Sequence, residues 1–67
     1  MMRRIIRRIQ KNDAEEIRIT VFGYRGSEAI DIRVFFKVGA DEFLPSRKGL
    51  IISRSLLKEV LKALVEV

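Results

Sequence analysis

The sequence contains no cysteine and no histidine. Disulfides are therefore excluded, and the common nitrogen and sulfur ligands of a metal site are missing. A chain of 67 residues buries only about 60% of its unfolded surface, so a fold of this size usually needs disulfides, a metal or an oligomer. Because 48% of the residues are hydrophobic, enough for a core and an interface, we expect a homodimer with no metal and no cofactor.

Recognisable catalytic machinery is missing as well. No glycine-rich phosphate loop, nucleophile elbow or metal-ligand spacing occurs. The adjacent carboxylates Glu15-Glu16 and Asp41-Glu42 would point to opposite faces of a strand, or into solvent in a turn, so neither pair suits acid–base chemistry. The sequence therefore predicts a protein that is not an enzyme.

Long apolar segments are also lacking. No run approaches the roughly 20 residues that span a bilayer, and the N-terminal arginines leave no signal-peptide apolar region. We expect a soluble, intracellular protein of the cytoplasm or nucleoid (the nucleus in a eukaryote), with no membrane partner. The formal net charge is +5 and the pI about 10.3, which favours a polyanionic partner such as nucleic acid. A highly charged surface of the thermophilic type is the alternative.

Apolar residues recur with a period of two from residue 17 onward. Residues 17–22 and 29–38 show the alternation of half-buried strands, and shorter strands are expected at 42–44 and 48–52, on either side of Pro45-Ser46. Turns are expected at 23–26 and 39–41, where glycines occur. Consecutive strands joined by short turns predict an antiparallel meander.

The C-terminal segment has helical periodicity. Ser53 is a suitable N-cap because its hydroxyl accepts a hydrogen bond from a first-turn N–H. The apolar stripe that follows is wider than one small sheet needs. We expect it to pack on its own sheet and also on a partner subunit, although covering only its own sheet is the alternative. The dimerisation residues expected are Leu57, Val60, Leu61 and Leu64.

Residues 1–16 are the hardest to assign. Ile5, Ile6 and Ile9 have helical spacing among four arginines, which is compatible with a basic amphipathic turn, a frayed strand or a mobile arm. Asn12-Asp13 is typical of a turn. The arginines are equally compatible with a clamp on phosphates and with a solvated basic tail. We therefore treat 1–16 as a basic N-terminal arm or short extra element, and 17–67 as the domain.

Four segments carry a resemblance to a known family: Tyr24-Arg25-Gly26-Ser27, Ile30 to Phe36, Pro45 to Leu50, and Ser53 onward. They resemble the single-stranded-DNA-binding domain of the transcriptional coactivator positive cofactor four and its archaeal, bacterial and phage relatives. That family reads aromatic-Lys-Gly-Lys, a hydrophobic-Asp-Ile-Arg strand ending in an aromatic, Pro-Gly-Arg-Lys-Gly-Ile and a capped helix. The resemblance implies an α+β fold, a four-stranded curved antiparallel sheet followed by one C-terminal helix (β-β-β-β-α), in a homodimer.

The resemblance also implies the partner and the site. Such a dimer binds single-stranded DNA without sequence readout, which needs cations along the phosphates and rings against the bases. Three positions depart from the pattern: Ser27 replaces a lysine, Phe36 a tryptophan, and Ile51 a residue that is often small and polar. The implied nucleic-acid-binding residues are Tyr24, Arg25, Gly26, Arg33, Phe36, Arg47 and Lys48.

Several alternatives stay open. Arg33 can pair with Asp31, Tyr24 can be a core or rim residue, and Arg47 and Lys48 can form a solvated turn. Strict alternation favours Phe35 over Phe36 as the base-stacking ring, unless a bulge intervenes. The single-strand partner can also be melted duplex, with RNA as a variant and the transcription machinery as a further partner. The competing functions are an architectural binder of double-stranded DNA and a protein-interaction module whose helix docks on a larger machine.

Overall fold

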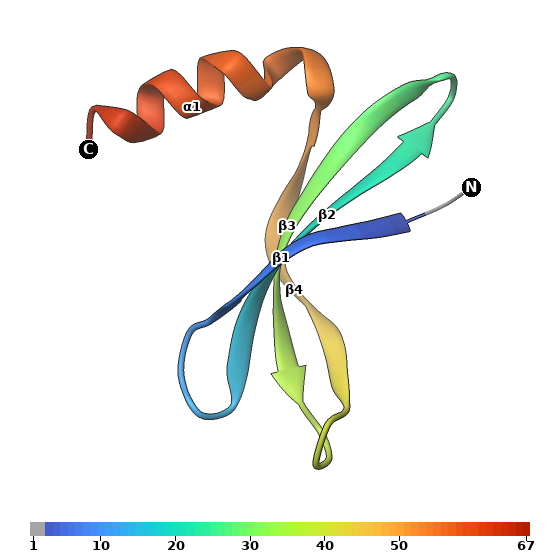
Figure 1. The fold of residues 1–67 in the computed structure, drawn as a ribbon, viewed down its shortest axis with the longest axis vertical. Helices are drawn as coiled ribbons and strands as arrows, with labels where there is room; N and C mark the ends of the chain where they lie inside the picture. Colours follow the sequence, from blue (N-terminus) through green and yellow to red (C-terminus); the bar gives the residue numbers. More distant parts are fainter. Residues whose placement is uncertain (1–2) are drawn as a thin grey trace.

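The computed structural model describes residues 3–67 and consists of a strongly twisted sheet followed by a helix (Figure 1). The strands are β1 (Arg3–Gln10), β2 (Glu15–Tyr24), β3 (Ser27–Lys37) and β4 (Phe43–Ser53), and a 3₁₀ turn (Arg54–Leu56) leads into α1 (Leu57–Val65). The strand order is β1-β2-β3-β4, and each strand is antiparallel to the next. This architecture confirms the predicted α+β class and the β-β-β-β-α order.

The basic N-terminal segment is part of the sheet. β1 pairs with β2 along its length. Of the alternatives considered for this segment (an amphipathic turn, a strand or a mobile arm), the strand is therefore the one that forms. The chain reverses at the predicted Asn12-Asp13 turn, where Asn12 Oδ1 accepts a hydrogen bond from the Ala14 N–H at 2.9 Å. The register shifts by one residue between Ile5 and Arg7, which makes Ile6 a β-bulge.

The two short strands predicted around Pro45-Ser46 are wrong, because one continuous strand, β4, runs through both residues. Proline is tolerated there because β4 is an edge strand that pairs only with β3. Arg33 pairs with Gly49 and Phe35 with Pro45, so β4 has three residues (46–48) where β3 has one. Arg47 and Lys48 lie in this three-residue bulge of β4. The strand count stays at four since β1 replaces the lost strand.

The turn between β2 and β3 is a two-residue hairpin. Tyr24 pairs with Ser27, and the two residues between them, Arg25 and Gly26, have φ angles of 51° and 79°. Positive φ at both central positions is the requirement of a type I′ turn, whose twist matches that of the flanking strands. The glycine therefore has a conformational role, whereas Arg25 occupies a region that disfavours most side chains.

The hydrophobic core lies on one face of the sheet, which we call the core face. Its buried centre is Val21, Ile30 and Ile52, from three successive strands. The period of two that predicted these strands is confirmed, because their odd- and even-numbered residues separate onto the two faces as expected. The residues packed against the centre are Ile19, Ile32, Leu57 and Val60.

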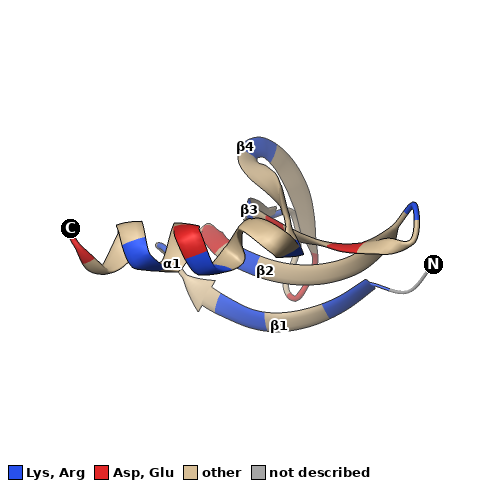
Figure 2. Ribbon diagram, turned by 90° about the horizontal axis from the view of Figure 1, so that it is seen from above, with Lys and Arg blue, Asp and Glu red and all other residues tan. Residues whose placement is uncertain are grey.

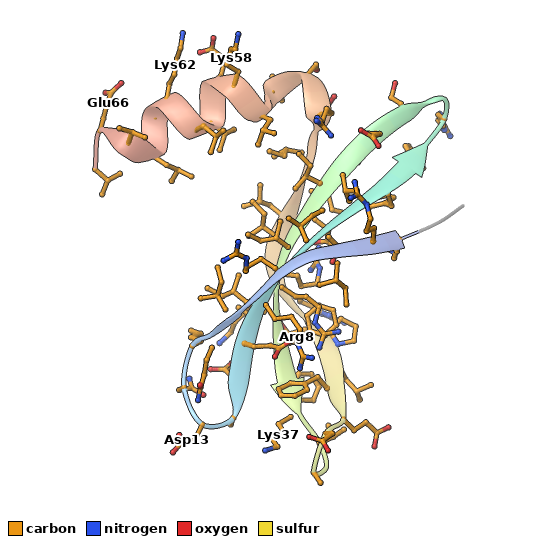
Figure 3. The ribbon with its side chains drawn as sticks, in the orientation of Figure 1. Arg8, Asp13, Lys37, Lys58, Lys62 and Glu66 are labelled. Carbon is orange, nitrogen blue, oxygen red and sulfur yellow. The ribbon has the colours of Figure 1, made fainter. Side chains whose placement is uncertain are left out.

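The helix covers only one end of this core. Ser53 caps the 3₁₀ turn that leads into the helix, with its Oγ accepting a hydrogen bond from the Ser55 N–H at 3.3 Å, whereas the N-cap of α1 itself is Leu56, which makes no side-chain cap hydrogen bond. α1 then extends beyond the sheet edge (Figure 1). Lys58 and Lys62 point away from the sheet, and carbon-only side chains lie on the other side of the helix (Figure 3). In residues 3–67, no helix has the length and apolar character to cross a membrane.

Candidate nucleic-acid interface

The sheet face opposite the core is charged. Across β2 and β3, Arg18 lies opposite Arg33, and Thr20 lies opposite Asp31. On β1, Arg3 lies opposite Phe22 and Arg8 opposite Arg18. We call this surface the arginine face. It comprises Arg3, Arg8, Glu16, Arg18, Thr20, Phe22, Asp31, Arg33 and Phe35, and Figure 2 shows the basic segments along β1.

Glu16 is a buried carboxylate at one end of this face. Its Oε2 accepts hydrogen bonds from Arg8 Nε and Arg18 Nε, both at 2.8 Å. The hydrogen bond from Arg8, together with that from Arg18, holds the pKa of the Glu16 carboxyl below its ordinary value. The same contact raises the pKa of Arg8. The carboxylate therefore stays ionised and fixes two guanidinium groups.

Asp31 contacts two arginines at the other end of the face. It is buried, and Arg33 Nε donates to its Oδ1 at 3.0 Å. Arg3 Nη1 lies 3.5 Å from its other oxygen, Oδ2. The pairing of Arg33 with Asp31, which the sequence left as an alternative, is therefore present. It orients Arg33 without removing it from the surface, since 19% of the side chain is exposed.

A groove of about 840 Å³ opens beside these residues. It brings together Arg33, Phe36 and Arg47, three of the residues expected at the site, which come from two strands. Both cations and rings line it, the combination that a single strand of nucleic acid needs. The remaining lining residues are Arg3, Asp31, Phe35, Pro45, Ser46 and Ile51.

The bulge in β4 forms one wall of the groove, and Ser46 holds its shape. The Ser46 hydroxyl donates to the Val34 carbonyl at 2.7 Å and accepts from the Lys48 N–H at 3.1 Å. Arg33 Nη1 donates to the Ser46 carbonyl at 3.1 Å. The bulge leaves Arg47 and Lys48 exposed, with Arg47 lining the groove. A bulge of this kind re-aims side chains at the edge of a sheet.

The two adjacent phenylalanines take different positions. Phe35 is on the arginine face, as strict alternation predicts, and the Arg18 guanidinium lies 4.0 Å from its ring centroid. Phe36 is exposed and lines the same groove, one residue beyond the point where the register between β3 and β4 shifts. Arg18 covers the face of Phe35, so Phe36 has the freer ring.

The remaining expected residues form the β2–β3 turn, at the opposite end of the sheet from the β3–β4 turn (Figure 1). The Tyr24 side chain is 53% exposed, so it is not a core tyrosine. The Arg25 guanidinium lies 5.3 Å from the Tyr24 ring centroid. Gly26 permits the turn and has open space where a Cβ would stand. The turn thus offers a second set of ring and cation, separate from the groove.

Sequence reasoning missed Arg18 and Asp31 as parts of the site, and it left open whether the N-terminal arginines, Arg3 among them, bind phosphates or form a solvated tail. Arg18 could have been predicted, because alternation along its strand places it on the same face as Thr20 and Phe22, opposite the apolar face of Ile17, Ile19 and Val21. Arg3 could not be placed on a face, since its segment was not assigned to a strand. Asp31 was considered only as a competitor for Arg33, and its burial beneath two arginines depends on cross-strand contacts.

The fold and the site together define a small β-β-β-β-α protein with a cationic, ring-bearing sheet face. The chain belongs to the family of the transcriptional coactivator p15 (PC4), which matches residues 11–63. The resemblance seen in the sequence is therefore confirmed. A comparison with curated protein sequences gives no match.

Solved structures show the same family. A PC4 homologue from Burkholderia pseudomallei K96243, in its orthorhombic crystal form, has a TM-score of 0.85 and 32% identity, with 92% of this chain and 84% of that chain covered. Its tetragonal form gives 0.85 and 31%, with 96% and 94% covered. The bacteriophage T5 homologue of the eukaryotic coactivator has a TM-score of 0.74 at 22% identity, covering 98% and 76%, and shares the fold.

Proposed function

We propose that this protein binds single-stranded DNA without sequence preference, as a homodimer that acts with the transcription or replication machinery. The observation that carries the proposal is the groove in which Arg33, Arg47 and the ring of Phe36 meet. Cations that follow phosphates and rings that stack on bases are what such binding requires, and neither reads sequence. Family membership supports a DNA-binding role, and the phage relative is described as implicated in recombination-dependent DNA replication.

The shape of the sheet favours a single strand over a duplex. Binding to duplex DNA through a groove usually places a helix or strand ribbon against base edges, or inserts an apolar wedge. The helix α1 has two lysines on its solvent side (Figure 3), whereas Arg3, Arg8 and Arg18 lie over aromatic rings on the arginine face of the sheet. Exposed rings can stack on an unpaired base, because both faces of such a base are accessible.

The homodimer rests on the helix. Leu61 and Leu64 are 53% and 60% exposed in one chain, although they continue the stripe of Leu57 and Val60 that packs on the core. An apolar face of this kind on a 67-residue chain is expected to find a partner, and a second copy with two-fold symmetry presents the same face in return.

A titration of labelled single-stranded DNA, duplex DNA and single-stranded RNA at two salt concentrations tests the binding. Single-stranded DNA should bind most tightly, and log affinity should fall with log salt by about 0.7 for each phosphate neutralised. Tyr24→Ala should weaken binding by about 1–3 kcal/mol per stacked base and leave the salt slope unchanged, whereas Arg47→Ala should reduce the slope. Displacement of the single strand by duplex DNA would overturn the proposed preference for single strands. Tighter binding of RNA than of DNA would mean that RNA is the ligand.

Sedimentation tests the dimer. The wild type should sediment at twice the 7.8 kDa chain mass, and the double substitution Leu61→Asp with Leu64→Asp should give the monomer. The matched control is Lys58→Asp with Lys62→Asp on the solvent side of the same helix, which should remain dimeric. A monomeric wild type would refute this part of the proposal.

A further inference from the structure

The bulge in β1 sorts its four arginines onto two faces. Arg3 and Arg8 are five residues apart, and an odd separation places side chains on opposite faces of a regular strand. The shift at Ile6 removes this mismatch, so Arg3 lies opposite Phe22 and Arg8 opposite Arg18, both on the arginine face. Arg4 and Arg7 lie opposite Val21 and Ile19, on the core face.

The two arginines on the arginine face are held by buried partners. Arg8 Nε donates to Glu16 at 2.8 Å, and Arg3 Nη1 lies 3.5 Å from Asp31. Each guanidinium also lies over a ring: Arg3 is 4.3 Å from the centroid of Phe22, and Arg8 is 5.4 Å from that of Phe43. These contacts limit the side-chain freedom that binding a phosphate would otherwise remove.

Among the four arginines that contact the two buried carboxylates, Arg3 and Arg8 are the more exposed pair. Their side chains are 55% and 52% exposed, whereas the side chains of Arg18 and Arg33, which share the same carboxylates, are 16% and 19% exposed. Each buried carboxylate contacts two arginines but neutralises only one positive charge, so each cluster keeps an excess of one positive charge. The excess charge of each cluster is presented at β1, where Arg8 contacts Glu16 through its Nε.

We infer that β1 is a phosphate-binding edge of the interface, in which Arg3 and Arg8 each bind one backbone phosphate of the same single strand. The inference rests on the proposed function and extends it to a strand outside the segment that matches the family. The residues opposite them on β2 are four apart, or about 13 Å at 3.3 Å per residue, too far for one phosphate. The planar guanidinium suits bidentate contact with phosphate oxygens.

The experiment compares two double variants of equal charge. In Arg3→Ala with Arg8→Ala, the salt slope for single-stranded DNA should fall by about 1.4, which is two phosphates at about 0.7 each. The affinity ratio of wild type to variant should then grow about sevenfold as salt falls from about 200 mM to about 50 mM. Arg4→Ala with Arg7→Ala removes the same charge from the core face of the same strand, and its slope should match the wild type.

The arginine-face variant should still fold, because Glu16 keeps Arg18 and Asp31 keeps Arg33. A second variant, Arg3→Lys with Arg8→Lys, keeps the charges and should retain most of the salt slope. Lys58→Ala with Lys62→Ala on the helix is a further control of equal charge.

The outcomes separate the two proposals. A wild type that does not bind single-stranded DNA refutes the proposed function itself. A wild type that binds, with an unchanged slope in Arg3→Ala with Arg8→Ala, overturns only the assignment of β1. Equal losses in the two arginine variants would mean that net charge acts alone, and would also overturn it.

Discussion

Replacing Gly49 by alanine should destabilise the sheet at the point where the site is built. Gly49 pairs with Arg33 across β3 and β4. A Cβ at Gly49 would lie 2.5 Å from the Ile32 carbonyl oxygen and 2.8 Å from the Arg33 Cα. Both atoms belong to the backbone, so no side-chain rotation relieves the overlap, and β4 must move away from β3.

The cost follows from that overlap. Inserting one methyl group into a packed position typically costs about 1–3 kcal/mol. For a domain of this size, a loss of about 2 kcal/mol corresponds to a fall in Tm of about 8–16 °C. Affinity for single-stranded DNA should fall too, because Arg33 shares the strand pair that is pushed apart.

The assay is urea denaturation at one fixed protein concentration, since the stability of the proposed dimer would depend on concentration. The control is Gly39→Ala, where a Cβ would meet only the Glu42 side chain, at 3.5 Å and 3.6 Å. That substitution should change the free energy of unfolding by less than about 0.5 kcal/mol. If Gly49→Ala unfolds with the same midpoint as Gly39→Ala, the close approach of β4 to β3 is not a constraint on this fold.

Two further substitutions test the turn and the carboxylate cluster. Arg25→Asn should raise the free energy of unfolding by about 1 kcal/mol, because asparagine tolerates the positive φ at this position. The same substitution should weaken DNA binding, because it removes a cation. Thermal melts should therefore show a gain in stability while a DNA titration shows a loss of affinity. The lowered pKa of Glu16 means that this carboxylate contributes stability above its ordinary value of 4.5, which is lost as pH falls through the lower folded value. Glu16→Gln should flatten that acid dependence in melts between about pH 5 and pH 2, and an unchanged profile would remove Glu16 from the explanation.

Local patterns were sufficient for much of the fold. The alternation of Ile17, Ile19 and Val21 predicted a strand with one buried face, since a period of two needs no knowledge of neighbours. Ser53 predicted the start of the helical segment because a cap is a contact within one turn. The exposed ring of Tyr24 followed in the same way from its place beside a turn.

Pairing between strands was needed for the rest. The parity of Phe35 and Phe36 was predicted correctly, but that both rings line one groove depends on a bulge in the neighbouring strand. The bulge places residues 46–48 of β4 opposite one residue of β3, and nothing in the local sequence marks where such an irregularity in the pairing falls. The same applied to Pro45, which interrupts a strand by its chemistry and is accommodated only because β4 lies at an edge.

Local sequence patterns were enough to indicate which faces of the strands are apolar, where the C-terminal helical segment begins and which family the chain resembles. The folded sheet was needed to show that the N-terminal arginines lie in a strand, and that two of them share buried carboxylates with Arg18 and Arg33. The physical reason is that an ion pair across strands depends on register, and register is set by contacts between residues far apart in the chain. The number of charged residues can be counted from a sequence, but the face of the sheet on which they lie depends on how the strands pair.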